Sequence, residues 1–192
     1  MIPLIPYNGV LRPVIMLVSI GLTFLVLYKA RHRRCYKRLL FVACIGYVGL
    51  LLYATFLSRN VAQTYSYRLE FLGSAKRAFS VEGGVWELFK GDFAAIQLNE
   101  LRSLEAIAIN LLLMVPMGFL IPMTFAVYGI EIRAWQVILF GSVLSITIEF
   151  VQLITRLGMF DIDDWVFNTI GVALGYLSYR RIFDDNNISM IK

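Results

Sequence analysis

The chain alternates long apolar stretches with shorter polar segments. Five apolar stretches approach the ~20 residues that an α-helix needs to cross the hydrocarbon core of a bilayer. They predict transmembrane helices at residues 10–28, 39–57, 106–126, 135–154 and 164–180. The fifth stretch carries the weakest signal, because Asp163, Asp164 and Asn168 lie at its outer end. The pattern as a whole predicts an all-α, polytopic membrane helix bundle of about five transmembrane helices.

Composition places the chain among membrane proteins. Of its 192 residues, 59% are hydrophobic and 16% are charged, and the mean hydropathy is +0.71. Soluble domains carry roughly 25% charged residues, so this chain has too little polar surface to cover a soluble core. We therefore expect a single integral membrane domain over residues 1–192.

Basic residues set the expected orientation of the chain. The net charge is +5, and the densest positive run lies between the first two spans, at Lys29, Arg31, Arg33, Arg34, Lys37 and Arg38. Positively charged loops stay in the cytoplasm, which places the N-terminus outside, the C-terminus inside and residues 58–105 outside. A basic run between two apolar spans is typical of a cytoplasmic anchor, so we expect no nucleic-acid partner.

The external segment mixes aromatic residues with charged residues and glycines. The aromatic residues are Phe71, Phe79, Trp86, Phe89 and Phe93. This composition favours short amphipathic helices that lie in the headgroup layer. A folded cap over the end of the bundle is an alternative, and the two interpretations are compatible.

Polar side chains recur inside the apolar stretches. Those of the fourth span are Ser142, Ser145, Glu149, Gln152 and Arg156. Their steps of three and four place them on one helical face, which must meet protein or water. The orientation above brings this face to the extracytoplasmic end of the bundle, where it meets Asn110, Asp161, Asp163, Asp164 and Asn168. A carboxylate among lipid-facing residues costs several kcal/mol unless it is paired, hydrated or protonated, so we expect the chain to use this polar cluster.

Small residues and a proline indicate how the helices meet. Gly171 and Gly175 share one side of the fifth span, and this spacing lets another helix approach closely. We expect that side to pack against the fourth span, because the short link 155–163 makes the two helices an antiparallel hairpin. In the third span, Pro116 removes a backbone hydrogen bond just before Gly118. The resulting kink either shapes a cavity or only adjusts packing.

Three chemical interpretations of the polar cluster stay open. Carboxylate and amide oxygens suit Mg²⁺ or Ca²⁺, and such a metal could hold a lipid pyrophosphate while a carboxylate acts as a base. Alternatively, the cluster forms a cleft for a polar headgroup, with Arg156 attracting phosphate or carboxylate. In a structural role, Arg156 pairs with one aspartate and Glu149 is buried with amide partners. The spacing matches no metal motif, so we expect no metal and no cofactor, and we assign no catalytic residue.

The order and spacing of these residues resemble the VanZ-like family. The resemblance rests on Asn110, Pro116, Gly118, Ser145, Glu149, Gln152, Arg156, Asp161, Asp163, Asp164, Asn168, Gly171 and Gly175. It covers roughly residues 106–180, and residues 53–59 are also similar to the segment that ends the family's second span. Val115 departs from the family pattern, which often has an aromatic residue at that place.

The resemblance implies a multi-pass protein of the bacterial cell membrane, in a family named for a member that gives low-level resistance to the lipoglycopeptide antibiotic teicoplanin. We expect an outward-facing cleft that engages an amphiphile, either the antibiotic's acyl chain or the headgroup of an envelope lipid. The expected partners are therefore membrane lipids, the antibiotic or a lipid-linked cell-wall precursor. Teicoplanin carries a fatty acyl tail and vancomycin does not, so a groove for the tail predicts discrimination between them.

Two other function classes fit the same residues. One is a membrane enzyme that modifies a lipid-linked cell-wall precursor, which predicts a chemical change in extracted lipids. The other is a structural membrane scaffold, in which the polar cluster only holds the helices together. For the scaffold, changes in the cluster should lower stability, and resistance should fall only as the protein level falls.

Overall fold

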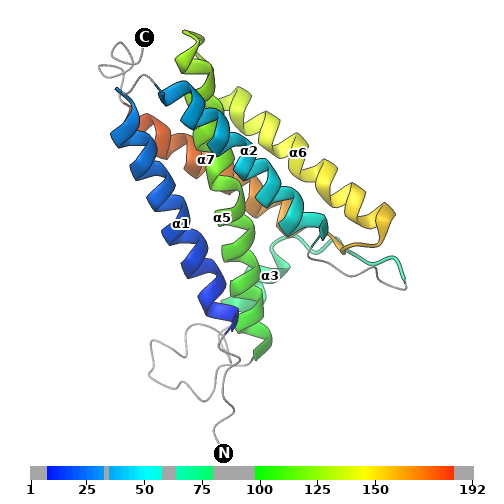
Figure 1. Ribbon diagram of the computed structural model, residues 1–192. Helices are drawn as coiled ribbons and strands as arrows, with labels where there is room; N and C mark the ends of the chain where they lie inside the picture. Colours follow the sequence, from blue (N-terminus) through cyan, green and yellow to red (C-terminus); the bar gives the residue numbers. More distant parts are fainter. Residues whose placement is uncertain (1–7, 33–34, 58–63, 80–97, 184–192) are drawn as a thin grey trace, which may run out of the picture.

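The computed structural model describes residues 8–32, 35–57, 64–79 and 98–183, and these residues are predominantly helical (Figure 1). The long helices are α1 (Asn8–Ala30), α2 (Tyr36–Leu52), α5 (Leu98–Val127), α6 (Ala134–Thr155) and α7 (Ile162–Ile182). A π-helical turn, η1 (Tyr53–Leu57), extends α2, and α3 (Gly73–Ala78) is a short helix. Two short strands, β1 (Tyr67–Arg68) and β2 (Phe160–Asp161), pair in parallel.

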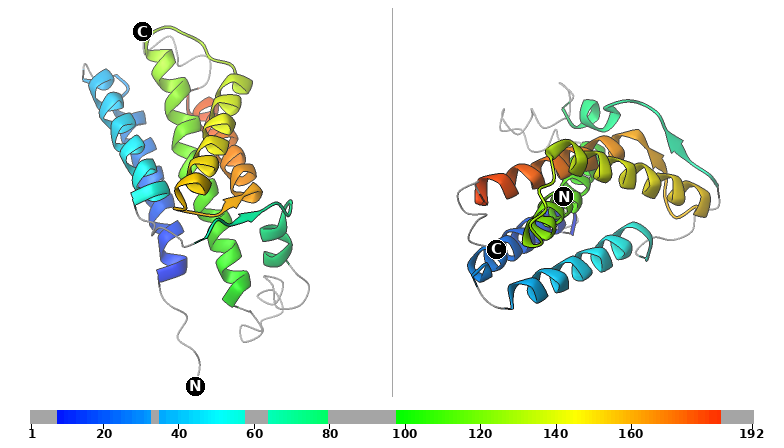
Figure 2. Two further views of the ribbon diagram at one scale, coloured as in Figure 1. Left: turned by 90° about the vertical axis from the view of Figure 1, so that its right-hand side faces the viewer. Right: turned by 90° about the horizontal axis from the view of Figure 1, so that it is seen from above.

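Helix α5 occupies the centre of the bundle. It contacts each of the other long helices, with α1 and α2 on one side and α6 and α7 on the other (Figure 2). Successive long helices run in opposite directions, so the loop between α1 and α2 lies at one end of the bundle. The strands and α3 lie toward the other end, where α5 and α7 begin (Figure 1). The basic loop between α1 and α2 is therefore at the opposite end of the bundle from β1, β2 and α3.

Each predicted span falls on a helix, and the protein has the surface of a membrane protein. Within the described residues, three helical segments are long and apolar enough to cross a bilayer: Tyr36–Phe56, Arg102–Val127 and Ala134–Thr155. Large apolar side chains face outward on them; Phe41 is 66% exposed and Phe140 is 58% exposed. Such continuous apolar surface is expected against lipid. Five crossings and the in–out orientation remain predictions.

The external segment differs from its predicted extent. Helix α5 begins at Leu98, so residues 98–105 belong to this helix and not to a separate segment before position 106. The predicted start followed the end of the apolar stretch, but leucine, arginine and glutamate favour a helix that continues past it. Phe71 and Phe79 are exposed near α3. The other predicted aromatic contacts, at Trp86, Phe89 and Phe93, fall outside the described residues.

The glycine stripe of α7 packs against α5, which corrects the expectation that it meets the fourth span. A Cβ atom added to Gly171 would collide with the carbonyl oxygen of Leu111, and one added to Gly175 would collide with that of Val115. From α5, Gly118 fits in the same way against the carbonyl oxygen of Val172. Because small residues let backbones approach, α5 and α7 touch backbone to backbone along this face.

Helix α6 meets α7 through a different face. Gly141 of α6 packs against the side chain of Val172, which is fully buried. Together with Met114, Val137 and Ile148, Val172 belongs to the apolar core between α5, α6 and α7. The predicted antiparallel hairpin of α6 and α7 is present, but it packs through Val172 and polar side chains instead of the glycine stripe. The polar contacts lie at the end of the hairpin that carries the candidate site.

Candidate functional site

A two-stranded ladder fixes the edge of the candidate site. Arg68 of β1 lies opposite Asp161 of β2, and the Phe160 N–H donates to the Ser66 carbonyl oxygen over 3.1 Å. The Arg68 guanidinium donates through Nη1 to Asp161 Oδ2 at 3.2 Å and forms an ion pair with it. The Asp161 side chain is 6% exposed and that of Arg68 is 38% exposed, so the cation reaches solvent while its partner is buried.

Asp161 also begins helix α7. Its Oδ1 accepts the N–H of Asp163 at 3.0 Å, which is the bond of an N-cap residue. Its own N–H donates to Glu149 Oε2 at 3.1 Å, and Glu149 is 3% exposed. A carboxylate near the first turn of a helix is favourable because the helix dipole is positive there. Glu149 and Asp161 therefore both accept hydrogen bonds from backbone N–H groups.

Asp163 attaches α3 to the start of α7. Its Oδ2 accepts the backbone N–H of Ser74 at 2.6 Å. Asp163 is completely buried, and its second oxygen, Oδ1, has no hydrogen-bond partner among the described residues. A buried acceptor without a donor costs free energy, so Asp163 Oδ1 lowers the stability that the network provides.

Polar side chains join the three central helices at the same end. Asn110 of α5 donates to Asp164 Oδ1 at 2.5 Å, and Asn168 donates to Ser145 Oγ of α6 at 2.9 Å. The indole N–H of Trp165 donates to Ser142 Oγ over 2.9 Å. Hydrogen bonds between helices in a membrane each contribute about 0.6–2 kcal/mol. These contacts fix the rotation of α7 between α5 and α6.

Gln152 extends the network to the end of α2. Its Nε2 donates to the Thr55 carbonyl oxygen at 2.9 Å, and both residues are buried. Thr55 lies in η1, where carbonyl groups at a helix end lack partners within the helix. Gln152 Oε1, like Asn168 Oδ1, has no hydrogen-bond partner among the described residues. Gln152 thus connects α6 to the end of α2.

Arg156 does not join the acids. It ends α6 with a left-handed backbone conformation (φ 57°), and its guanidinium lies over the ring of Tyr65 at 5.5 Å. No described residue forms an ion pair with it, so the proposed pairing of Arg156 with an aspartate is wrong. Among the described residues, Asp161 forms its ion pair with Arg68, which the sequence pattern did not indicate.

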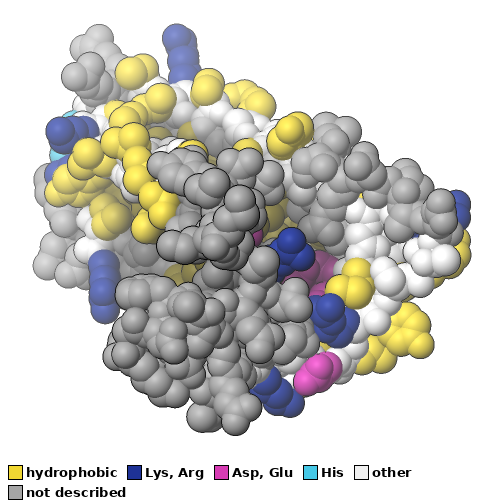
Figure 3. Space-filling model, turned by 90° about the horizontal axis from the view of Figure 1, so that it is seen from below, with side chains coloured by type: hydrophobic (Ala, Val, Ile, Leu, Met, Phe, Trp, Pro, Cys, Tyr) yellow, Lys and Arg dark blue, Asp and Glu magenta, His cyan; other side chains and the backbone are white. Residues whose placement is uncertain are grey.

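A cavity of about 440 Å³ lies beside these acids. It is lined by Arg68, Ser74, Arg102, Ser103, Ala106, Met159, Asp161 and Asp164. From the predicted polar cluster, Asp161 and Asp164 reach this cavity, whereas Glu149, Gln152, Arg156, Asp163 and Asn168 do not line it. Figure 3 shows basic side chains beside acidic ones on the corresponding face of the bundle. The cavity therefore carries both signs of charge and an apolar side.

Sequence reasoning missed Arg68, Arg102, Ser74 and Ser103. All of them belong to the external segment 58–105, whose Lys and Arg residues are spread thinly and balanced by acids. One signal was present: Arg102 precedes Ala106 by four positions, so both lie on one face of the helix that leads into the third span.

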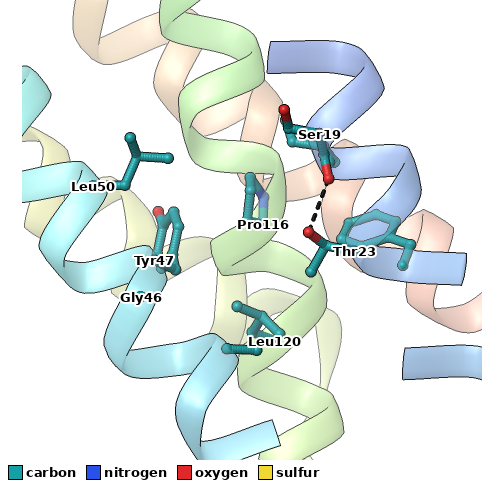
Figure 4. Close-up of a pocket in the computed structure, with 10 residues that line it drawn as sticks. Ser19, Thr23, Gly46, Tyr47, Leu50, Pro116 and Leu120 are labelled. Carbon is teal, nitrogen blue, oxygen red and sulfur yellow. Dashed lines mark hydrogen bonds between the residues drawn. The ribbon is translucent and has the colours of Figure 1, made fainter. Parts of the chain in front are cut away.

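A second, apolar groove lies deeper, between α1, α2 and α5 (Figure 4). Its volume is about 280 Å³, and Tyr47, Leu50, Pro116 and Leu120 are among its walls. The hydroxyl group of Thr23 donates to the carbonyl oxygen of Ser19 at 2.8 Å, so it does not make the groove polar. The apolar lining of the groove is suited to a methylene chain.

The arrangement of the acids bears on metal binding. Among the described residues, no group of three or more His, Cys, Asp or Glu side chains has the geometry of a metal site. Asp161 directs its two oxygens to an N–H group and a guanidinium, and Glu149 accepts an N–H. These groups serve helix caps and an ion pair in this arrangement.

Comparison with protein families assigns the chain. The family model described as VanZ/LLP1 matches residues 41–184, which is most of the chain. This protein belongs to the VanZ/LLP1 family. The VanZ/LLP1 match runs from α2 to the end of α7 and includes every residue that lines the polar cavity. No curated protein matches the chain, and no solved structure does. The family match and the apolar helices together identify a VanZ/LLP1 membrane protein.

Proposed function

We propose that this VanZ/LLP1 protein contributes to teicoplanin resistance at the bacterial cell envelope by holding the polar part of an amphiphile in the 440 Å³ cavity. The observation that carries the proposal is the lining of that cavity. Charged side chains of both signs stand beside Ala106 and Met159, at one end of an otherwise apolar bundle. Pockets that combine apolar walls with a few placed polar groups are typical ligand sites.

The position of the cavity supports an amphiphile over a soluble ligand. It opens where α5 leaves the apolar part of the bundle, between Arg102 and Ala106. An amphiphile bound there would hold its headgroup in the cavity, with its chains along the exposed apolar helices. The basic loop is at the opposite end of the bundle, and under the positive-inside rule this supports an extracytoplasmic position for the cavity. Teicoplanin acts on that side of the membrane.

The test replaces one acid of the cavity without changing its shape. Asp164→Asn removes the charge that faces both the cavity and Asn110, so teicoplanin resistance should fall. The matched control is Glu131→Gln, an exposed acid in the loop after α5. Both variants are compared with the parent protein for teicoplanin susceptibility at equal protein levels in the membrane.

The outcome separates the proposal from a scaffold role. Loss of resistance in Asp164→Asn at an unchanged protein level supports the cavity as the site of action. A loss that only follows a lower protein level indicates a scaffold, in which the Asn110–Asp164 bond holds helices. Unchanged resistance at an unchanged level removes the cavity from the mechanism.

The apolar groove favours a second version of the same function. We propose there that the acyl chain of teicoplanin enters the groove between α1, α2 and α5. The supporting observation is its lining, which is formed largely by aliphatic and aromatic side chains next to Pro116. The two versions differ in which part of an amphiphile is held, and variants of Asp164 and of Gly46 separate them.

A further inference from the structure

Two guanidinium groups that line the cavity have N–H donors without a partner among the described residues. Arg68 uses Nη1 for Asp161, and no other described residue bonds to its remaining N–H groups. Arg102 also lines the cavity, and within the described part of the chain nothing bonds to its side chain. A guanidinium has five N–H donors in a fixed fork. Most of the hydrogen-bonding capacity that the two arginines bring to the cavity is therefore unused.

The acids of the cavity are engaged by the protein itself. Asp161 accepts from Asp163 N–H and from Arg68, and Asp164 accepts from Asn110. A cationic ligand would compete with these donors for the carboxylate oxygens. An anionic ligand would instead meet free donors on Arg68 and Arg102. The balance of engaged acceptors and unused donors points to an anion.

The rest of the lining narrows the class of anion. Phosphate oxygens match the planar fork of arginine and are bound by two parallel hydrogen bonds. Ala106 and Met159 give the cavity an apolar side that a fully hydrated ion does not need. A phosphate that is attached to an apolar chain satisfies both sides of the cavity.

We infer that the cavity binds the phosphate of a lipid headgroup through Arg68 and Arg102. This inference deepens the proposed function and rests on it for the placement of the cavity at the membrane surface. Asp161 is a positioning residue for Arg68, because their ion pair holds the guanidinium at the cavity wall. The phosphate itself contacts the two arginines.

The test measures binding to the full chain purified in a neutral detergent. The probes are short-chain phosphatidic acid, an uncharged diacylglycerol with the same chains, and inorganic phosphate. Arg102→Gln is the decisive variant, because its side chain has no described partner whose loss would unfold the protein. The matched control is Arg156→Gln, which removes the same charge from the same end of the bundle. The Arg156 side chain lies over Tyr65 and does not line the cavity.

The expected result is that phosphatidic acid binds the parent protein and the Arg156→Gln control equally. Arg102→Gln should bind it at least about tenfold more weakly, because hydrogen bonds between charged groups are lost. Arg68→Lys, which keeps the charge beside Asp161 but loses the fork, should also weaken binding. The diacylglycerol should bind far more weakly than phosphatidic acid.

Two results would overturn the inference. Equal binding of phosphatidic acid by Arg102→Gln and the parent would show that the arginines do not hold the phosphate. Binding of inorganic phosphate as tightly as phosphatidic acid would show that free phosphate, not a lipid headgroup, is the ligand. Susceptibility assays are read separately: weaker lipid binding in Arg102→Gln with unchanged teicoplanin resistance would refute the proposed function and leave the phosphate site in place.

Discussion

Gly171 of α7 lies directly against the carbonyl oxygen of Leu111 in α5, with no room for a Cβ atom between them. Gly175 meets the carbonyl oxygen of Val115 in the same way, one turn further along. This contact sets the distance between the two helices that carry Asn110 and Asp164. The hydrogen bond at the edge of the polar cavity therefore depends on glycines that lie deeper in the bundle.

Gly171→Ala should destabilise the protein, because the added methyl group forces α5 and α7 apart. Overpacking of this kind costs typically 1–3 kcal/mol, which outweighs the gain in helix propensity. Thermal unfolding of the purified protein in detergent measures the effect. Gly46→Ala is the control: nothing lies within 4 Å of a Cβ at that position, so its unfolding temperature should be unchanged or higher. Equal effects of the two substitutions would contradict the backbone contact.

The two roles of Asp161 can be separated by a pair of substitutions. Asp161→Asn keeps an oxygen that caps α7 but loses the charge facing Arg68, whereas Asp161→Ala loses both. Loss of a cap costs about 1 kcal/mol, so the alanine variant should be less stable than the asparagine variant by about that amount. Thermal unfolding again gives the ranking. If the two variants unfold at the same temperature, the capping bond contributes nothing.

Much of the fold could be predicted from local sequence. Apolar stretches of sufficient length fix where the long helices lie, because a lipid environment leaves the backbone few alternatives. The meeting of Asn110 and Asp164 follows from placing both at one depth of the bundle. The identity of the helix that Gly171 contacts did not follow, because a small-residue stripe permits close approach by any neighbour. Only the three-dimensional arrangement, with α5 in the centre, selects the partner.

The cationic side of the candidate site could not be predicted in the same way. Arg68 and Asp161 are 93 positions apart and meet through strands of two residues each. Strands this short leave no alternation to detect in a sequence. Arg156 is closer to Asp161 in the sequence than Arg68 is. However, Arg156 ends α6 in a left-handed backbone conformation, and its side chain lies over Tyr65. Sequence distance is therefore a poor guide to ion pairs in loops between spans.

The predicted orientation can be tested with one native cysteine. Cys35 is exposed within the basic loop, and Leu69, beside Arg68 at the other end, is 63% exposed. A membrane-impermeant thiol reagent added to intact cells should label Leu69→Cys in a cysteine-free background. A chain that keeps only Cys35 should be labelled after the membrane is permeabilised and not before. The reverse pattern would place the polar cavity in the cytoplasm and remove it from the site of teicoplanin action.

Filling the apolar groove tests whether it takes the antibiotic's acyl chain. Gly46 forms part of the groove wall on α2 (Figure 4), and nothing lies within 4 Å of a Cβ there, so the larger side chain of Gly46→Leu should reduce the volume of the groove. Gly49→Leu is the matched control, since its Cβ is equally unobstructed and the residue does not line the groove. Gly46→Leu should lower teicoplanin resistance at an unchanged protein level, whereas Gly49→Leu should not.

Vancomycin supplies the second arm of this experiment, because it lacks the fatty acyl tail. If the groove holds that tail, Gly46→Leu should leave the vancomycin susceptibility of the cells unchanged while it raises their susceptibility to teicoplanin. A parallel shift for both antibiotics would mean that the substitution acts on the whole bundle, and no shift for either would exclude the groove. In the latter case the headgroup version remains, since Asp164 and Arg102 lie in the separate polar cavity.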